Sequence, residues 1–192
     1  YEAAAGLLDR ILTGHLVVSG QQAGQTINRN EVHARLLLAH CYETQARRKL
    51  STQSPEVLTT AQAARDEANT LFRRAAEAYE HLTRDLPQVS QFREMAGRLY
   101  LVAGEPEIAV LHLQRAIELD DSIGLRFLLA RARLEQTRSA SPSTRVFEAV
   151  ENELEELDNR VQQEPIAQPW TIELMRAELL ALKTAGDDSK NN

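Results

Sequence analysis

The stretch EMAGRLYLVAGEPEIAVLHLQRAIELDD, residues 94–121, decides the fold. Apolar residues recur every three or four places on both sides of Gly104 and Pro106, which is the pattern of two amphipathic helices. Glycine commonly ends a helix in a left-handed conformation, and proline is favoured in the first turn of the next helix. Each predicted helix carries a small residue, Gly97 or Ala109, that allows the two helices to approach closely. The stretch therefore predicts a tight helical hairpin.

This hairpin resembles a tetratricopeptide repeat, a unit of two antiparallel helices with small residues at fixed contact points. The residues that match the family pattern are Gly97, Tyr100, Gly104, Ala109, Leu113 and Ala116. Two positions differ: Asp121 stands where proline is usual, and Arg93 occupies the tryptophan position. The resemblance implies a superhelix in which the first helix of each hairpin lines a concave groove.

The same pattern continues in phase on both sides of the stretch. About 34 residues before Ala109, Leu113 and Asp121 there is a matching small, aromatic and proline series, Ala75, Tyr79 and Pro87. Ala39 and Ala130 also occupy the small-residue position, and an arginine stands four residues before each small residue, at Arg35, Arg93 and Arg126. We therefore expect an all-α fold of the α-α superhelix type, a tetratricopeptide-like solenoid of eight helices. A pair of four-helix bundles is the alternative architecture.

The expected organisation is a single repeat domain over residues 1–186, followed by a disordered tail at 187–192. The hairpins are expected at about 31–86, 88–121 and 122–163, with flanking helices at 2–18 and 168–185. Asn30 is expected to cap the second helix, and Asp121 or Ser122 the sixth. Ser141 and Pro142 are expected to open the seventh helix. One face of that helix is expected to carry Val146, Val150, Leu154, Leu157 and Val161.

Composition narrows the class of protein. Hydrophobic residues make up 43% of the 192 residues, which favours a folded chain over a disordered one. The formal net charge of −6 disfavours nucleic acid as a ligand. No apolar run reaches the ~18 residues of a membrane span, so we expect a soluble protein of the cytoplasm or the periplasm. The start at Tyr1 and the excess of arginine over lysine suggest a piece of a longer, bacterial protein.

The sequence carries no recognisable catalytic motif, and we expect no enzyme activity, cofactor or metal site. His33 and His40 lie about 10 Å apart along one predicted helix, too far for a single zinc ion. Cys41, the one cysteine, is interpreted as a small buried hydrophobic side chain. The acidic residues between Glu148 and Asp158 are interpreted as a solvated outer face of the seventh helix.

Three residues that directly follow a small contact residue are candidate peptide-binding residues: His40, Arg98 and Arg131. The resemblance implies that this position faces the concave groove. Arginine can bind a carboxylate through two parallel hydrogen bonds, so an acidic peptide or a C-terminal carboxylate is the expected ligand. The alternative is that these side chains are solvated or pair with nearby acids, namely Glu94, Glu43 or Glu135.

The expected function is a protein-interaction module or scaffold that binds a protein or peptide partner. Two alternatives stay open: a structural spacer or self-association segment of a larger protein, and a non-catalytic domain attached to an enzyme. The end helices are expected to lack neighbours and to promote self-association through exposed apolar residues. The expected exposed residues are Leu7, Leu8, Ile11 and Leu12 at one end, and Leu179, Leu180 and Leu182 at the other.

Overall fold

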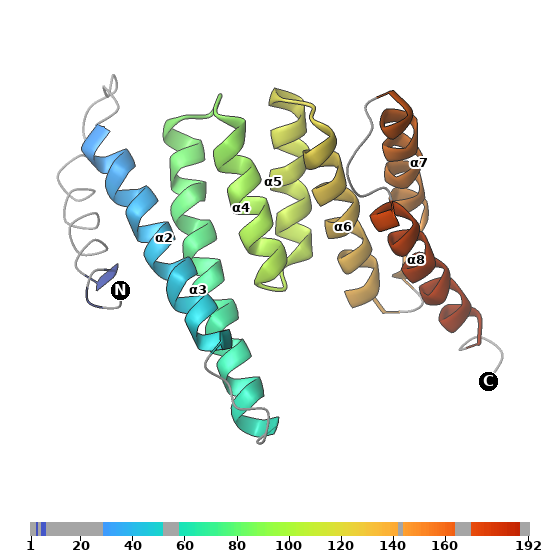
Figure 1. Ribbon diagram of the computed structural model, residues 1–192, viewed down its shortest axis with the longest axis horizontal. Helices are drawn as coiled ribbons and strands as arrows, with labels where there is room; N and C mark the ends of the chain where they lie inside the picture. Colours follow the sequence, from blue (N-terminus) through green and yellow to red (C-terminus); the bar gives the residue numbers. More distant parts are fainter. Residues whose placement is uncertain are drawn as a thin grey trace. The chain divides into compact units, whose positions relative to one another are not determined.

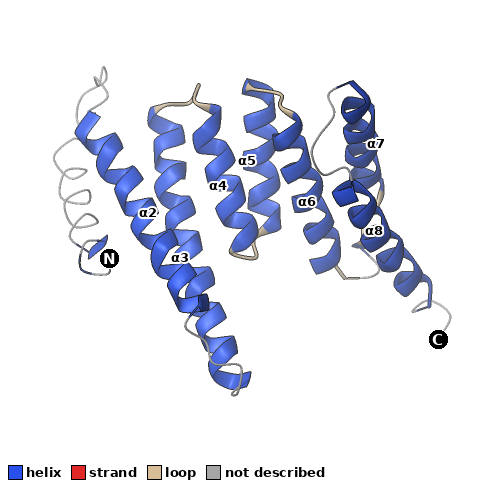
Figure 2. Cartoon of the chain, viewed as in Figure 1, coloured by secondary structure: helices blue, strands red, loops and turns tan. Residues whose placement is uncertain are grey.

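The computed structural model describes residues 3, 5–6, 29–51, 58–141, 144–163 and 170–188. These residues form seven helices and no strand, which confirms the all-α prediction (Figures 1 and 2). The first of the eight predicted helices, at 2–18, lies outside the described residues except for Ala3, Ala5 and Gly6, which are helical. None of the described helices has both the length and the apolar character needed to cross a lipid bilayer.

The helices follow one another along the chain, joined by connections that are mostly short. Their bounds are α2 (Arg29–Ser51), α3 (Leu58–Asp85), α4 (Ser90–Val102), α5 (Pro106–Leu119), α6 (Ile123–Ser139), α7 (Glu148–Gln163) and α8 (Trp170–Asp188). The second helix begins one residue earlier than predicted: α2 starts at Arg29, so Asn30 lies inside the helix.

The chain divides into two compact units, Tyr1–Glu105 and Pro106–Asn192. The division falls between α4 and α5, the two helices of the stretch at 94–121. Gly97 and Ala109 are both buried, as expected of contact positions, but each belongs to a different unit. The contact between Gly97 and Ala109 therefore stays a prediction. The single domain and the superhelix stay predictions as well.

In the first unit, α3 packs against both α2 and α4, and the short connection from α3 makes α4 run antiparallel to it (Figure 1). Alanine dominates the buried positions of α3, as at Ala68, Ala75 and Ala76, so the helices need little space between them. Tyr100 of α4 donates a hydrogen bond from its hydroxyl to Glu80 Oε2 of α3, at 2.9 Å. This bond and burial raise the pKa of Tyr100, burial being the larger cause.

Gly104 ends α4 in the left-handed conformation that the sequence predicts, with φ of 82°. The N–H of Glu105 donates to the carbonyl of Tyr100 at 2.9 Å, and the N–H of Gly104 donates to that of Leu101 at 3.2 Å. Together these two bonds are the Schellman arrangement, which satisfies carbonyls that the end of a helix leaves unpaired. Glycine is needed here because a side chain strains a backbone with positive φ.

Replacing Gly104 by alanine should therefore lower the free energy of unfolding by about 1–2 kcal/mol. Gly124 gives the matched control: it lies in the first turn of α6, its φ is not positive, and no atom would meet an added Cβ within 4 Å. Gly124→Ala should leave stability unchanged or raise it, because alanine is the better helix former. Urea unfolding of both variants measures the difference, and an equal effect would contradict the strained turn.

In the second unit, α6 packs against α5, α7 and α8, and α7 packs against α8. A core cluster fills the space between α6, α7 and α8, and its members are Ala130, Leu134, Val150, Leu154, Leu157, Ile172, Met175 and Leu179. Of the two predicted caps of α6, Ser122 is the one that caps it: its hydroxyl accepts a hydrogen bond from the N–H of Leu125 at 3.3 Å.

The predicted start of the seventh helix is wrong. α7 begins at Glu148, and the N–H groups of Val150 and Glu151 both donate to the carbonyl of Phe147 to close its first turn. The carbonyl of Ser141 instead accepts a hydrogen bond from the N–H of Thr144, at 2.9 Å. Val146 consequently precedes the helix and is exposed, whereas the remaining predicted face positions, Val150, Leu154, Leu157 and Val161, are buried or half-buried.

Candidate functional site

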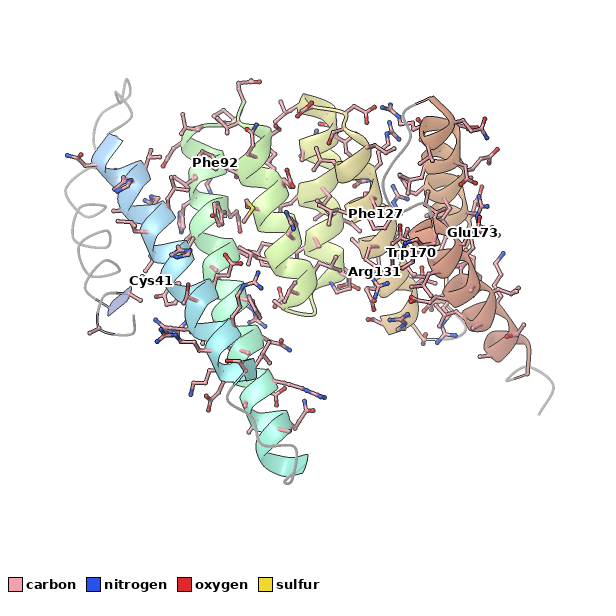
Figure 3. All side chains as sticks on the ribbon, viewed as in Figure 1. Cys41, Phe92, Phe127, Arg131, Trp170 and Glu173 are labelled. Carbon is pink, nitrogen blue, oxygen red and sulfur yellow. The ribbon has the colours of Figure 1, made fainter. Side chains whose placement is uncertain are left out.

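His40 lies on α2 with its side chain exposed. Its two sequence neighbours, Ala39 and Cys41, are both buried, so the helix turns His40 away from the core. Cys41 is a free, buried thiol, which confirms its interpretation as a small hydrophobic side chain (Figure 3). The position of His40 is thus compatible with contact to a ligand.

Arg98 lies on α4, next to the buried Gly97, and its side chain is 54% exposed. Its ion pair joins Nη1 to Glu94 Oε1, one helical turn earlier, at 3.5 Å. Charge-assisted hydrogen bonds of arginine are normally about 2.7–2.9 Å long, so this pair is loose. A guanidinium carries five N–H donors, and several of those on Arg98 therefore remain available to a ligand.

Arg131 lies on α6 in a different environment (Figure 3). Its guanidinium pairs with Glu135 at 3.0 Å and with Glu178 of α8 at 3.5 Å. Glu178 also accepts a 2.7 Å hydrogen bond from Arg138. Arg131 therefore helps to connect α6 to α8, and its charge is already neutralised within the second unit.

The three candidate residues are divided between the two units: His40 and Arg98 lie in the first, and Arg131 lies in the second. The expected ladder along one groove therefore stays a prediction. Of the pairings that the alternative foresaw, those with Glu94 and Glu135 are present. Glu43 instead pairs with Arg47, at 2.7 Å.

Two of the three arginines that stand four residues before a small residue, Arg35 and Arg126, form ion pairs with other parts of the chain. Arg35 of α2 is buried, donates to Glu31 at 2.7 Å and lies 4.0 Å from Asp85 at the end of α3. Arg126 of α6 donates through Nε and Nη2 to the two carboxylate oxygens of Asp121, each at 2.7 Å. The repeat pattern in the sequence identified these arginines but not their role in packing.

Asp121, at the position where the resembled family usually has proline, is an acceptor for two helices. In addition to Arg126, its carboxylate accepts a hydrogen bond from Arg160 of α7. The hydrogen bond from Arg126 is the largest cause that lowers the pKa of Asp121 below its ordinary value. The ionised carboxylate of Asp121 therefore helps to hold the start of α6 and the C-terminal half of α7 together.

The stabilising effect of Asp121 should depend on pH. Because its folded-state pKa lies below the unfolded value, its contribution is full above about pH 4 and is lost as the pH falls through the folded-state pKa. Asp121→Asn should therefore lower stability at pH 7, by less than about 1 kcal/mol since the pair is partly solvated, and the gap should narrow on acidification. Thermal unfolding between neutral and acidic pH measures it, with Asp120→Asn as the control for general charge.

The acidic run of α7 is only partly the solvated face that the sequence predicts. Glu148, Glu151 and Glu155 are exposed, but Glu153 is turned toward α6 and lies 3.3 Å from Arg133. Burial raises the pKa of Glu153, although Arg133 and Arg126 act in the opposite direction. For Glu153 the prediction is wrong, because the helix turn places it beside the core and opposite a cation.

The apolar residues predicted to be exposed on the eighth helix are only partly exposed, and those of the first helix, Leu7, Leu8, Ile11 and Leu12, lie outside the described residues. Leu180 is exposed as predicted, but Leu179 is buried and Leu182 is half-buried, because both turn toward the core of the second unit. Trp170 and Leu174 are also exposed, although the pattern of the sequence did not lead to their prediction. Their spacing with Leu180 along one helix was the signal that could have identified them.

A shallow groove of about 410 Å³ runs between α7 and α8. Its lining residues are Glu151, Leu154, Glu155, Arg176, Leu179, Leu180 and Lys183. Leucine side chains form the floor of the groove, acidic side chains line its α7 side, and basic side chains line its α8 side. Two ion pairs cross the groove, from Lys183 to Glu151 and from Arg176 to Asp158.

Within the described part of the chain, no three His, Cys, Asp or Glu side chains are grouped so that they could hold a metal ion.

No protein-family model, curated protein or solved structure matches this chain. The tetratricopeptide resemblance therefore rests on the residues quoted from the sequence and stays a prediction.

Proposed function

We propose that this chain is a helical-repeat module that binds a protein or peptide partner, built from hairpins of a tetratricopeptide-like superhelix. The packing of α3 on both α2 and α4 supports this proposal, because repeat proteins stack each helix on its neighbours in this way. Such stacking presents the outer sides of successive helices as an extended surface for a partner. The superhelix also requires that the second unit continues the stack.

The observation that carries the proposal is the loose ion pair of Arg98. A guanidinium with its partner Glu94 at 3.5 Å and about half of its side chain exposed can turn to a better acceptor without a large energetic cost. Arginine binds carboxylates in a bidentate geometry, which gives direction as well as charge. Arg98 is therefore the candidate anchor for an acidic side chain or a C-terminal carboxylate.

His40 extends the candidate surface within the same unit, and Arg131 is its weakest member. His40 is exposed on α2, and an N–H of its imidazole ring can donate a hydrogen bond to a carboxylate of an acidic ligand. Arg131 is paired with both Glu135 and Glu178 and has fewer donors left for a partner.

Charge reversal at Arg98 tests the proposal. Arg98→Glu should lower the affinity for acidic peptides at least about tenfold, because it removes an attraction and adds a repulsion. Binding by the unchanged protein should also weaken with added salt. The measurement is fluorescence anisotropy with a set of acidic peptides, each prepared with a free C-terminal carboxylate and with a C-terminal amide.

Arg84→Glu is the matched control, because Arg84 is also exposed and pairs with a glutamate one turn away, Glu80 at 3.2 Å, but on α3. This control should bind the peptides as the unchanged protein does. Arg131→Glu is less suitable as a test, since it would place a third carboxylate beside Glu135 and Glu178 and destabilise the second unit. If the Arg98→Glu and Arg84→Glu variants bind the peptides equally well, Arg98 does not contribute to the binding site and the proposed basic surface is wrong.

A further inference from the structure

The groove between α7 and α8 has negative charge to offer a partner but no positive charge. Two ion pairs cross it, Lys183 with Glu151 and Arg176 with Asp158, and they neutralise both of its cations. Glu155 also lines the groove, but it is exposed and has no ion pair or hydrogen bond with any described residue. Glu155 therefore lies between the two ion pairs as an uncompensated carboxylate.

Two further acidic side chains border the same groove. Glu148 stands one turn before Glu151 on the same side of α7; it is exposed and has no ion pair with any described residue. Glu173 projects from α8 with 72% of its side chain exposed, and its pair with Arg176, at 3.6 Å, is loose (Figure 3). The arginine and lysine side chains of the two described helices, by contrast, all form ion pairs. The charge available to a partner on this surface is therefore acidic.

The spacing of the three available carboxylates matches a helix laid along the groove. The ion pairs join the first half of α7 to the second half of α8 and the reverse, so the two helices run antiparallel. Glu148 and Glu155 are seven residues apart, which is about 10 Å along the axis. The register of the ion pairs places Glu173 opposite Val161, about 9 Å beyond Glu155. Basic side chains that recur every seven residues, or two helical turns, would meet all three.

The floor of the groove requires an apolar side on the same helix. Leu154 and Leu179 belong to the core of the second unit, whereas Leu180 lines the groove with 62% of its surface exposed. The exposed side of α8 continues beyond Leu180 through Ala177 to Leu174, which is 48% exposed. An amphipathic helix lays its apolar side into a groove of this kind. Long basic side chains suit its flanks, because their stems lie on apolar surface while their charges reach a carboxylate.

We propose that the groove between α7 and α8 binds a basic amphipathic helix of a partner protein. The apolar side of that helix covers Leu180 and the leucine floor, and its lysine or arginine side chains pair with Glu148, Glu155 and Glu173. Complementary charge speeds the encounter and selects the partner. This site takes a ligand of the opposite charge from the surface proposed on α2 and α4 and does not depend on it.

The probe for the test is a labelled synthetic peptide with leucine at steps of three and four residues and lysine at steps of seven beside them. Fluorescence anisotropy with the whole chain should show saturable binding that weakens with added salt. The same peptide with glutamate in place of lysine should bind at least about tenfold more weakly, because its charge no longer matches. A scrambled peptide of the original composition should be weakened as much, because it lacks a continuous apolar side.

Charge reversal at Glu155 locates the site. Glu155→Lys should weaken binding of the lysine peptide at least about tenfold and strengthen binding of the glutamate peptide. Glu77→Lys is the matched control, since Glu77 is also exposed and has no ion pair with any described residue, but it lies on α3. Both substitutions change the net charge equally, and circular dichroism should show unchanged helix content in both.

Three results would overturn the proposal. The first is the absence of saturable binding by the lysine peptide. The second is an equal effect of Glu155→Lys and Glu77→Lys, or equal binding of the ordered and scrambled peptides, because net charge alone would then attract the peptide. The third is a chain that dimerises in sedimentation velocity while the lysine peptide fails to compete, because a second copy would then occupy the groove.

Discussion

The packing of both units depends on alanine at the helix contact positions. Among the residues that the structure describes, the alanines with no exposed surface are Ala39, Ala46, Ala68, Ala75, Ala76, Ala96, Ala109, Ala116, Ala130 and Ala132. Alanine brings helix backbones close together, but each one buries little apolar area, so leucines such as Leu82, Leu113 and Leu157 supply most of the hydrophobic stabilisation. The helices can therefore not spread to admit larger residues at these positions without losing contacts all along their length.

Ion pairs between helices complement this alanine packing in the second unit. Arg126 and Arg160 both donate to Asp121, and Arg131 reaches Glu178 of α8. The pairs lie at the edges of the core, where a long arginine side chain can cover apolar surface and still reach a carboxylate. Pairs of this kind add little free energy each, because both partners are partly solvated.

The sequence predicted the parts of the structure that local signals determine. Gly104 and Pro106 set the bounds of α4 and α5, and the hydroxyl of Ser122 caps α6 as expected. The start of α7 was predicted wrongly because Ser141 also favours a turn, and the choice between turn and cap depends on the tertiary packing of the residues that follow. The pairing of Arg131 with Glu178 and that of Glu153 with Arg133 were equally beyond prediction, since each joins two helices that only the folded arrangement brings close.

The single cysteine and the single tryptophan of the chain fall in different units. Cys41 is buried on α2, so a thiol reagent can modify it only when the first unit opens, and the rate of modification measures that opening. Trp170 is mostly exposed at the start of α8, and its fluorescence responds to whatever covers that helix in the second unit. The natural sequence thus contains one spectroscopic or chemical reporter for each unit, and the local stability of each can be followed separately without introducing a label.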